Sequence, residues 1–309
     1  MKKTRFCPAK INLFLEVTGK RPNGYHELST LFAKINLGDT LTLEVTPARQ
    51  TQISLQVTGP LAGWVPVSPQ NLVCQAAQLF LDHYGLTAKV NITLDKHVPT
   101  GAGLGGGSSD AAGVLIELCE QFGKNPLELI EPAAKLGADV PLFLYPDTFL
   151  KGEGIGEKLT PITAANKLPH LVLLYPNQAV STQEVFARMQ VPEKKEILTN
   201  LLKLDKLIDV VRNGDSLEMW KPLLFNRLEE YVLPFVPVVA NAVEWLQQAN
   251  LGICSMSGSG STVFSLVGTK KNAQELVAKL QHTKAMVFSA AFYGGTSYAN
   301  YGDQSSSNP

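Results

Sequence analysis

The sequence predicts an α+β fold of about two domains. Residues 11–17, 41–45 and 53–57 each alternate apolar and polar side chains, and a period of two residues is typical of a β-strand. Residues 194–248 show helical periodicity instead, and 309 residues correspond to two domains at roughly 100–200 residues each. Because antiparallel strands and helices are mixed, the pattern favours α+β over a doubly wound parallel sheet.

The first predicted strand, residues 11–17, is expected to be half-buried. Its apolar side chains share one face and its polar side chains share the other, which places Lys10 and Asn12 on the same side. The segment 21–24 contains Pro, Asn and Gly, and it predicts a turn. The next two alternating segments are expected to pair with each other as antiparallel strands.

The segment from Ser68 to Gly85 predicts a helix. Ser68 is a residue type that caps helices, Pro69 suits the first helical position, and Gly85 suits the end, so the helix is expected to stop at about Tyr84. The alternating residues 90–94 predict the strand that follows.

A run of glycines, residues 101–107, separates that strand from a second helix. Apolar residues at helical spacing give this helix one buried face, and Gly123 is expected to end it. Asn125 and Pro126 begin another helical piece, which Pro132 is expected to break or kink.

The second half of the chain shows the same kinds of element. Ser181 and Glu184 form a capping-box pattern that opens a helix, and the Gly/Ser-rich residues 256–261 are expected to lie between two short strands. Further expected elements are a strand at 171–175, helices at 194–248 and 273–281, and a strand at 285–290. We expect domains at residues 1–155 and 156–293, followed by a disordered polar tail at 294–309.

Composition and charge exclude several classes of protein. The 27 Lys and Arg residues balance the 27 Asp and Glu residues, and there is no basic block, so we expect no nucleic-acid partner. No stretch reaches about 18 apolar residues, and the start of the chain is too polar for a signal peptide, so no membrane segment is expected. The four cysteines lie far apart, which is typical of reduced thiols in a cytoplasmic protein.

The strongest chemical signal is the segment from Pro99 to Ser109, in which five glycines occur within seven residues just before a helix. Glycine lets the backbone approach a ligand closely, and free N–H groups at a helix start bind anions, so the segment predicts a phosphate cradle. Gly101, Gly103 and Gly106 fit the dinucleotide-binding pattern, but the acidic residue expected about 20 positions later, after a second strand, is absent. The P-loop pattern fails because no Gly-Lys-Ser/Thr follows.

Four segments in the same order resemble the GHMP kinases, a family that includes galactokinases and homoserine, mevalonate and phosphomevalonate kinases. They are residues 8–13 with 24–28, 99–109, 136–141 and 256–261. The resemblance implies an ATP-dependent kinase with an N-terminal domain similar to domain 2 of ribosomal protein S5 and a ferredoxin-like C-terminal domain. The first segment pair is similar to the branch of the family that phosphorylates the 2-hydroxyl of 4-(cytidine 5′-diphospho)-2-C-methyl-D-erythritol (CDP-methylerythritol) in non-mevalonate isoprenoid precursor synthesis.

The resemblance also assigns roles at the reacting centre. It implies that Asp139 accepts the proton of the substrate hydroxyl and that Lys10 keeps Asp139 ionised or contacts the reacting groups. Asn12 is expected to hydrogen-bond the substrate. A helix cap at Asp139 and a solvated outer-face lysine at Lys10 are the alternative interpretations.

On the cytosine side, the resemblance implies that the base stacks between Tyr25 and Phe186 while His26 binds its polar edge. Thr182 is expected to contact the substrate from the same segment as Phe186.

For ATP, the resemblance implies contacts from Pro99, Thr100, Gly101, Ala102, Gly103, Leu104, Gly105, Gly106, Gly107, Ser108 and Ser109, with Lys96 and Asn71 on the adenine side. Mg²⁺ is expected because ATP is handled as its magnesium complex, and Ser109 is a candidate ligand for it. Ala102 stands where another glycine is expected, so its φ should be negative. Asp110 is expected to point away from the phosphates, which it would repel.

Three alternatives stay open from the sequence. They are another GHMP kinase, a non-catalytic nucleotide-binding module of the same fold, and an NAD-dependent oxidoreductase. Tyr25 and His26 argue against the first, and the presence of both Lys10 and Asp139 argues against the second. The chain is expected to act on its small-molecule substrate as a monomer or homodimer.

Overall fold

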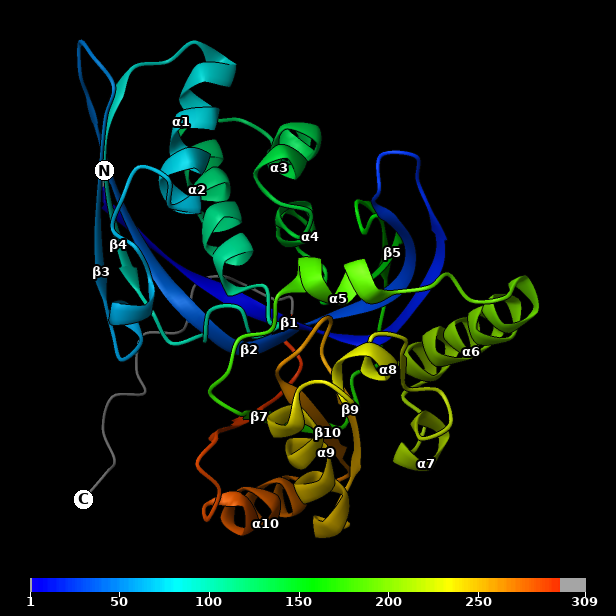
Figure 1. The fold of residues 1–309 in the computed structure, drawn as a ribbon. Coiled ribbons are helices and arrows are strands. Elements are labelled where there is room, and N and C mark those ends of the chain that lie inside the picture. Colours follow the sequence, from blue (N-terminus) through cyan, green and yellow to red (C-terminus); the bar gives the residue numbers. More distant parts are fainter. Residues whose placement is uncertain (1, 295–309) are drawn as a thin grey trace.

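The computed structural model describes residues 2–294, and these form two sheets that pack together at the middle and end of the first strand (Figure 1). Within the described residues, the first sheet consists of β1 (Lys2–Lys20), β2 (His26–Pro47), β3 (Gln52–Thr58), β4 (Ala88–Asp95), β5 (Phe149–Gly154), β6 (Lys158–Ile162) and β8 (Phe225–Asn226). The second sheet consists of β7 (His170–Tyr175), β9 (Ile253–Met256), β10 (Val263–Val267) and β11 (Met286–Ala290).

The second sheet is antiparallel, and its strand order is β11-β7-β10-β9. Counted along the chain this is the order 4-1-3-2, which is the order of a ferredoxin-like sheet. The predicted α+β class is therefore confirmed. The first sheet extends past residue 155 because β6 pairs with β5, and the division at residues 155 and 156 stays a prediction. The disordered tail predicted at 294–309 lies outside the described residues, apart from Gly294.

Most helices cover the outer faces of the two sheets (Figure 1). On the first sheet they are α1 (Leu72–Tyr84), α2 (Gly106–Phe122), α3 (Ile130–Leu136) and α4 (Val140–Leu144), with short 3₁₀ turns at Ala62–Trp64 and Pro126–Leu129. The second half contributes α5 (Thr182–Arg188), α6 (Lys194–Asn213), α7 (Leu217–Trp220), α8 (Glu229–Val232), α9 (Pro237–Ala249) and α10 (Lys270–Leu280). Of these, α6 packs against β1 and β2 on the side of the second sheet. None of the helices in residues 2–294 has the length and apolar character needed to cross a bilayer.

β1 is buried on both faces, so the prediction of a half-buried strand was wrong. Lys10 and Asn12 are 4% and 2% exposed, and Glu16 is fully buried. The Ile11 face belongs to a core shared with α6 and the second sheet, while the polar face is covered by the loops of the site. The alternating pattern predicted the period of the strand correctly. It did not predict that the polar face is buried, because polar side chains can be buried when they have partners.

The predicted pairing of β2 with β3 was also wrong. β4 lies between them, antiparallel to β2 and parallel to β3. The two strands are neighbours in the sequence, but the chain leaves through α1 before it returns to fill the position between them.

Two helix boundaries differ from the prediction. α1 begins at Leu72, and its cap is Asn71, whose side chain accepts a hydrogen bond from the backbone N–H of Val73. Ser68 and Pro69 precede that helix. Pro132 lies in the first turn of α3, where the missing N–H is tolerated, and the change from 3₁₀ to α-helix falls at Ile130.

One short strand carries the second half of the chain back to the first sheet. β8 pairs in parallel with β1 at Phe14 and Leu15, and the backbone N–H of Arg227 donates to the Leu15 carbonyl. Residues from beyond position 220 thereby lie beside the strand that carries Lys10.

Candidate active site

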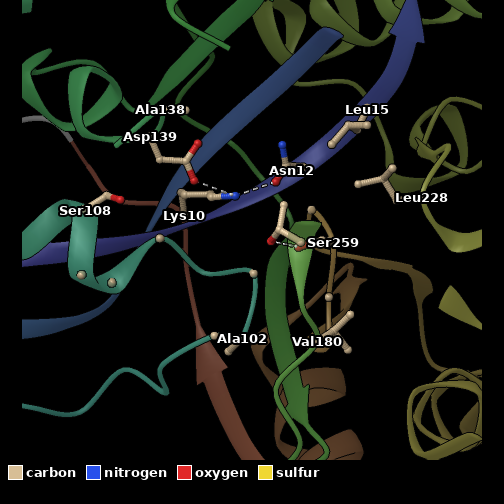
Figure 2. Close-up of a pocket in the computed structure, with 18 of the residues that line it drawn as sticks. Lys10, Asn12, Leu15, Ala102, Ser108, Ala138, Asp139, Val180, Leu228 and Ser259 are labelled. Carbon is tan, nitrogen blue, oxygen red and sulfur yellow. Dashed lines mark hydrogen bonds and ion pairs between the residues drawn. The ribbon is translucent and has the colours of Figure 1, made fainter. Parts of the chain in front are cut away.

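A cavity of about 460 Å³ opens where the two sheets meet, and it brings together most of the predicted site residues (Figure 2). Its walls are the middle of β1, the glycine run, the turn between α3 and α4, the start of α5 and the loop between β9 and β10. The predicted residues that line it are Lys10, Asn12, Pro99, Thr100, Gly101, Ala102, Gly103, Gly105, Gly106, Gly107, Ser108, Asp139, Thr182 and Phe186.

Lys10 stands at the centre of this cavity with Asn12 and Asp139 on either side (Figure 2). The Lys10 Nζ lies 3.5 Å from Asp139 Oδ2, and it donates a hydrogen bond of 2.8 Å to Asn12 Oδ1. The Asn12 Nδ2 in turn donates to Thr30 Oγ1 at 2.9 Å, which fixes the amide. The ammonium is therefore buried, paired with a carboxylate and held in place from the strand.

Asp139 occupies the N-cap position of α4 but does not cap it. Its side chain accepts no hydrogen bond from the first turn, and one third of the side chain remains exposed. The carboxylate points into the cavity towards Lys10 instead (Figure 2). An available carboxylate beside an ammonium can accept a proton from a bound alcohol, whereas a capping carboxylate has its lone pairs engaged.

The glycine run forms the predicted cradle at the N-terminus of α2. Gly101, Gly103 and Gly105 have φ between +64° and +76°, so each adopts the left-handed conformation that favours glycine. Ala102 is not among the residues of positive φ, as expected, and it is buried. α2 begins at Gly106 with no side-chain cap, so its first N–H groups face the cavity and can bind an anion.

Lys96 and Asp110 lie beneath the cradle rather than in the cavity. The Lys96 Nζ donates to Asp39 Oδ2 at 2.5 Å and to Asp110 Oδ2 at 2.8 Å, and all three side chains are buried. Burial raises the pKa of Asp110 to about 8, against the lowering influence of Lys96. Asp110 therefore points away from the cavity, as expected, and into the protein interior, where Lys96 donates to it.

Three other residues predicted to contact ATP do not line the cavity, and one of them, Leu104, is buried. Asn71 caps α1 and donates to the Pro66 carbonyl, and its neighbour Leu72 lines the cavity instead. Ser109 is buried, while Ser108 faces the cavity (Figure 2). Successive helical residues differ by about 100° around the axis, so the register of α2 decides which hydroxyl is exposed.

A second cavity, of about 750 Å³, continues from the first and holds the other predicted substrate residues. Tyr25 and His26 line it, and Thr182 and Phe186 belong to both cavities. The His26 ring stacks on Phe186 with centroids 5.2 Å apart, while Tyr25 is 60% exposed. Burial and the nearby Lys20 lower the pKa of His26, which favours the neutral imidazole at pH 7.

The loop between β9 and β10 also lines the site, although none of its residues was among the predicted site residues. Gly258, Ser259 and Gly260 line the first cavity, and Ser259 Oγ lies 2.7 Å from Thr182 Oγ1. The Gly/Ser pattern at 256–261 was the available signal. The pattern alone did not show that this loop, about 150 residues after the cradle, touches it.

Comparisons with known proteins agree on one family. The model of the GHMP kinases N terminal domain matches residues 71–147, and that of the GHMP kinases C terminal matches residues 204–285. A 4-diphosphocytidyl-2-C-methyl-D-erythritol kinase of Burkholderia multivorans is 37% identical over 278 residues, which cover 89% of this chain and 88% of the relative.

Two solved structures resemble this chain to a similar degree in fold but differ in their sequence identity to it. A crystal structure of 4-(cytidine 5′-diphospho)-2C-methyl-D-erythritol kinase matches with a TM-score of 0.74 and 31% identity, over 94% of this chain and all of that one. A homoserine kinase from Cytophaga hutchinsonii matches with a TM-score of 0.75 but only 16% identity, over 94% and 95% of the two chains. The second likeness shows the fold alone.

Proposed function

The chain belongs to the GHMP kinases and, within them, to the 4-diphosphocytidyl-2-C-methyl-D-erythritol kinases, and from this premise we propose how its residues carry out the reaction. The reaction transfers the γ-phosphoryl group of ATP to the 2-hydroxyl of CDP-methylerythritol, a step of non-mevalonate isoprenoid precursor synthesis. The observation that carries the proposal is the Lys10–Asp139 pair in the first cavity, which contains the anion cradle and adjoins a second cavity with aromatic side chains.

Asp139 acts as the general base. As the substrate oxygen bonds to the γ-phosphorus, the bond from phosphorus to the ADP oxygen breaks and the hydroxyl proton passes to the Asp139 carboxylate. The Lys10 ammonium, buried and 3.5 Å from that carboxylate, pairs with it and offsets negative charge on the transferring group. Asn12 orients the ammonium through its 2.8 Å hydrogen bond.

The ATP phosphates bind at the start of α2. The N–H groups there have no partner within the helix, and the helix dipole favours an anion at this end. The buried ammonium of Lys96 lies behind Gly106, 3.1 Å from where a Cβ would stand, and its charge is paired with Asp39 and Asp110. Lys96 thus supports the cradle from below rather than contacting adenine.

Mg²⁺ fits this site through the phosphates more than through the protein. No group of three or more His, Cys, Asp or Glu side chains within residues 2–294 could hold a metal ion. Mg²⁺ commonly keeps several waters and takes one or two protein oxygens together with substrate phosphates. Ser108, which faces the cavity, and Asp139 offer such oxygens, and bound Mg²⁺ would neutralise phosphate charge.

The cytosine binds in the second cavity. Tyr25 and Phe186 supply aromatic faces, and the His26 Nε2, a buried atom with no hydrogen-bond partner among the described residues, would bind the polar edge of the base. Because His26 already stacks on one face of Phe186, the base would occupy the space towards the exposed Tyr25 ring.

We also propose that the chain acts in the cytoplasm, where the free thiols of its cysteines stay reduced.

A substrate panel tests the proposal. ATP consumption should require CDP-methylerythritol and should be absent with mevalonate or homoserine at the same concentration. A uridine-diphospho analogue should be a poorer substrate, because a site built for hydrogen bonds rejects analogues that leave its polar groups unpaired. Equal turnover of the cytidine and uridine compounds would show that His26 does not read the base. Turnover of mevalonate or homoserine instead would overturn the assignment.

A further inference from the structure

We propose that Asn226 and Glu229 are positioning residues that hold the loop of residues 257–260 against both the ATP cradle and Lys10. Neither side chain lines the cavity, so neither is a catalytic residue in this proposal. The inference rests on the proposed function for the reaction that is measured, but the contacts that carry it are independent of the substrate.

Asn226 is bonded to the loop at two points. Its Nδ2 donates to the carbonyl of Met256 at 2.7 Å and to that of Gly258 at 2.8 Å, while its Oδ1 accepts from the backbone N–H of Leu228 at 3.0 Å. Asn226 is buried. Removing its amide would leave the two carbonyls without the side-chain donor that they share. Leaving buried carbonyls unpaired is costly, and the loop would have to rearrange to satisfy them.

Glu229 holds the entrance of the same loop. Its Oε1 accepts from Ser255 Oγ and from the backbone N–H of Met256, both at 2.7 Å. Burial raises the pKa of this carboxyl group. A neutral amide in its place would keep the accepting oxygen, which makes the Gln variant a suitable conservative replacement.

The loop held in this way touches both halves of the reacting centre. Ser257 Oγ donates to the Gly103 carbonyl at 2.8 Å and accepts from the Asn12 N–H at 3.3 Å. A Cβ at Gly103 would lie 2.2 Å from the Ser257 carbonyl oxygen, and one at Gly258 would lie 3.4 Å from Lys10 Nζ. A shift of the loop would therefore displace the cradle and Lys10 together.

The anchor itself is tied to the strand that carries Lys10. Arg227, between the two positioning residues, forms a bidentate ion pair with Glu16 of β1, with both N···O distances 2.9 Å. Asn200 of α6 also donates to Glu16, at 2.6 Å, but among the described residues it forms no hydrogen bond to the loop. Asn226 and Glu229 thus connect the loop to β1 through the buried ion pair of Arg227 with Glu16.

The test compares Asn226→Leu and Glu229→Leu with Glu229→Gln and with Asn200→Leu, which removes a buried amide of the same network away from the loop. For each variant we would measure kcat, the KM for both substrates, ADP affinity by calorimetry and the melting temperature. We expect the two loop-releasing variants to lose about 10- to 100-fold in kcat/KM for ATP and to bind ADP more weakly, since a displacement of 1 Å can cost about 10²-fold. Glu229→Gln should recover most of the activity lost in Glu229→Leu.

Asn200→Leu should lower the melting temperature while its kinetic constants stay near those of the wild type. If Asn226→Leu fails to fold, Glu229→Leu and Glu229→Gln provide the same comparison. Folded loop-releasing variants with wild-type kcat and ADP affinity would overturn the proposal, as would equal kinetic losses in Asn200→Leu. Lack of CDP-methylerythritol turnover by the wild-type chain would overturn the proposed function instead, and the ADP affinities would still test the positioning role.

Discussion

The site is built from two glycine-rich loops, and they differ in what surrounds their glycines. In the cradle, residues 101–107, the backbone leads into α2, and Gly107 has open space beside it: a Cβ there would meet only Leu72, at 3.7 Å. At Gly103 the protein fills that space, as it does in the loop of residues 257–260, where Asn12 and Lys10 lie beside Gly258. Glycine therefore allows close packing of the chain in both loops, and only in the cradle does it also leave open space at a position that lines the cavity.

The largest effect should come from Asp139, which belongs to neither loop. Asp139→Asn removes the proposed proton acceptor but keeps the shape of the side chain, so kcat should fall by about 10²–10⁴ while ATP affinity stays near the wild-type value. Steady-state kinetics and ATP titration measure the two quantities separately. Near-normal turnover would show that another group accepts the proton. Asp139 would then no longer define the reacting centre beside the two loops.

The next largest effect should come from Gly103, where the two loops meet. Gly103→Ala places a methyl group 2.2 Å from the Ser257 carbonyl at a φ of +76°, so the loops must separate, and kcat/KM for ATP should fall by about 100-fold. Gly268→Ala is the control, because a Cβ there would meet nothing within 4 Å, its φ is not positive and it lies outside the cavity. Similar kinetics for the two variants would contradict the different roles assigned to the glycines.

Changes in the second cavity should leave the KM for ATP unchanged, because neither glycine-rich loop lines this cavity. Stacking on an aromatic ring is worth roughly 1–3 kcal/mol per base, so Tyr25→Ala and Phe186→Ala should each raise the KM for CDP-methylerythritol about 5- to 150-fold. The KM for ATP, measured at saturating second substrate, should change little. If Phe186→Ala leaves cytidine binding untouched, Phe186 serves only to support His26.

The smallest effect should come from Ser257→Ala. It removes the hydroxyl that joins the Gly103 carbonyl to the Asn12 N–H, while the backbone contacts between the loops remain. At about 0.5–1.5 kcal/mol per hydrogen bond, kcat/KM for ATP should fall roughly 3- to 10-fold. An effect as large as that of Gly103→Ala would mean that the hydroxyl, rather than the close backbone contact, holds the loops together.

The sequence predicted what depends on local periodicity. The strand period put Lys10 and Asn12 on one face, and their side chains are hydrogen-bonded in the structure. The glycines of the cradle, the helix that follows them and the cap at Ser181 were predicted on the same basis and are confirmed.

Features that depend on distant partners were missed or rested on family resemblance. The 3.5 Å approach of Asp139 to Lys10 joins residues far apart in the chain, and no local pattern indicates it. The buried contact of Asp110 with Lys96 was not predicted, because no local pattern shows that Lys96 reaches it from another element. The choice between Ser108 and Ser109 depends on where α2 begins to within one residue.

The parallel pairing of β8 with β1 has a consequence for how the protein is made. The strand that bears Lys10 emerges from the ribosome first, but its hydrogen-bonding partner Ser257 follows 245 residues later. The cradle and the lysine are therefore synthesised long before the loop that aligns them, and such distant contacts make folding slow. A nascent or truncated chain that ends before the loop would lack the aligned site, so phosphoryl transfer should begin only when synthesis has passed the second sheet.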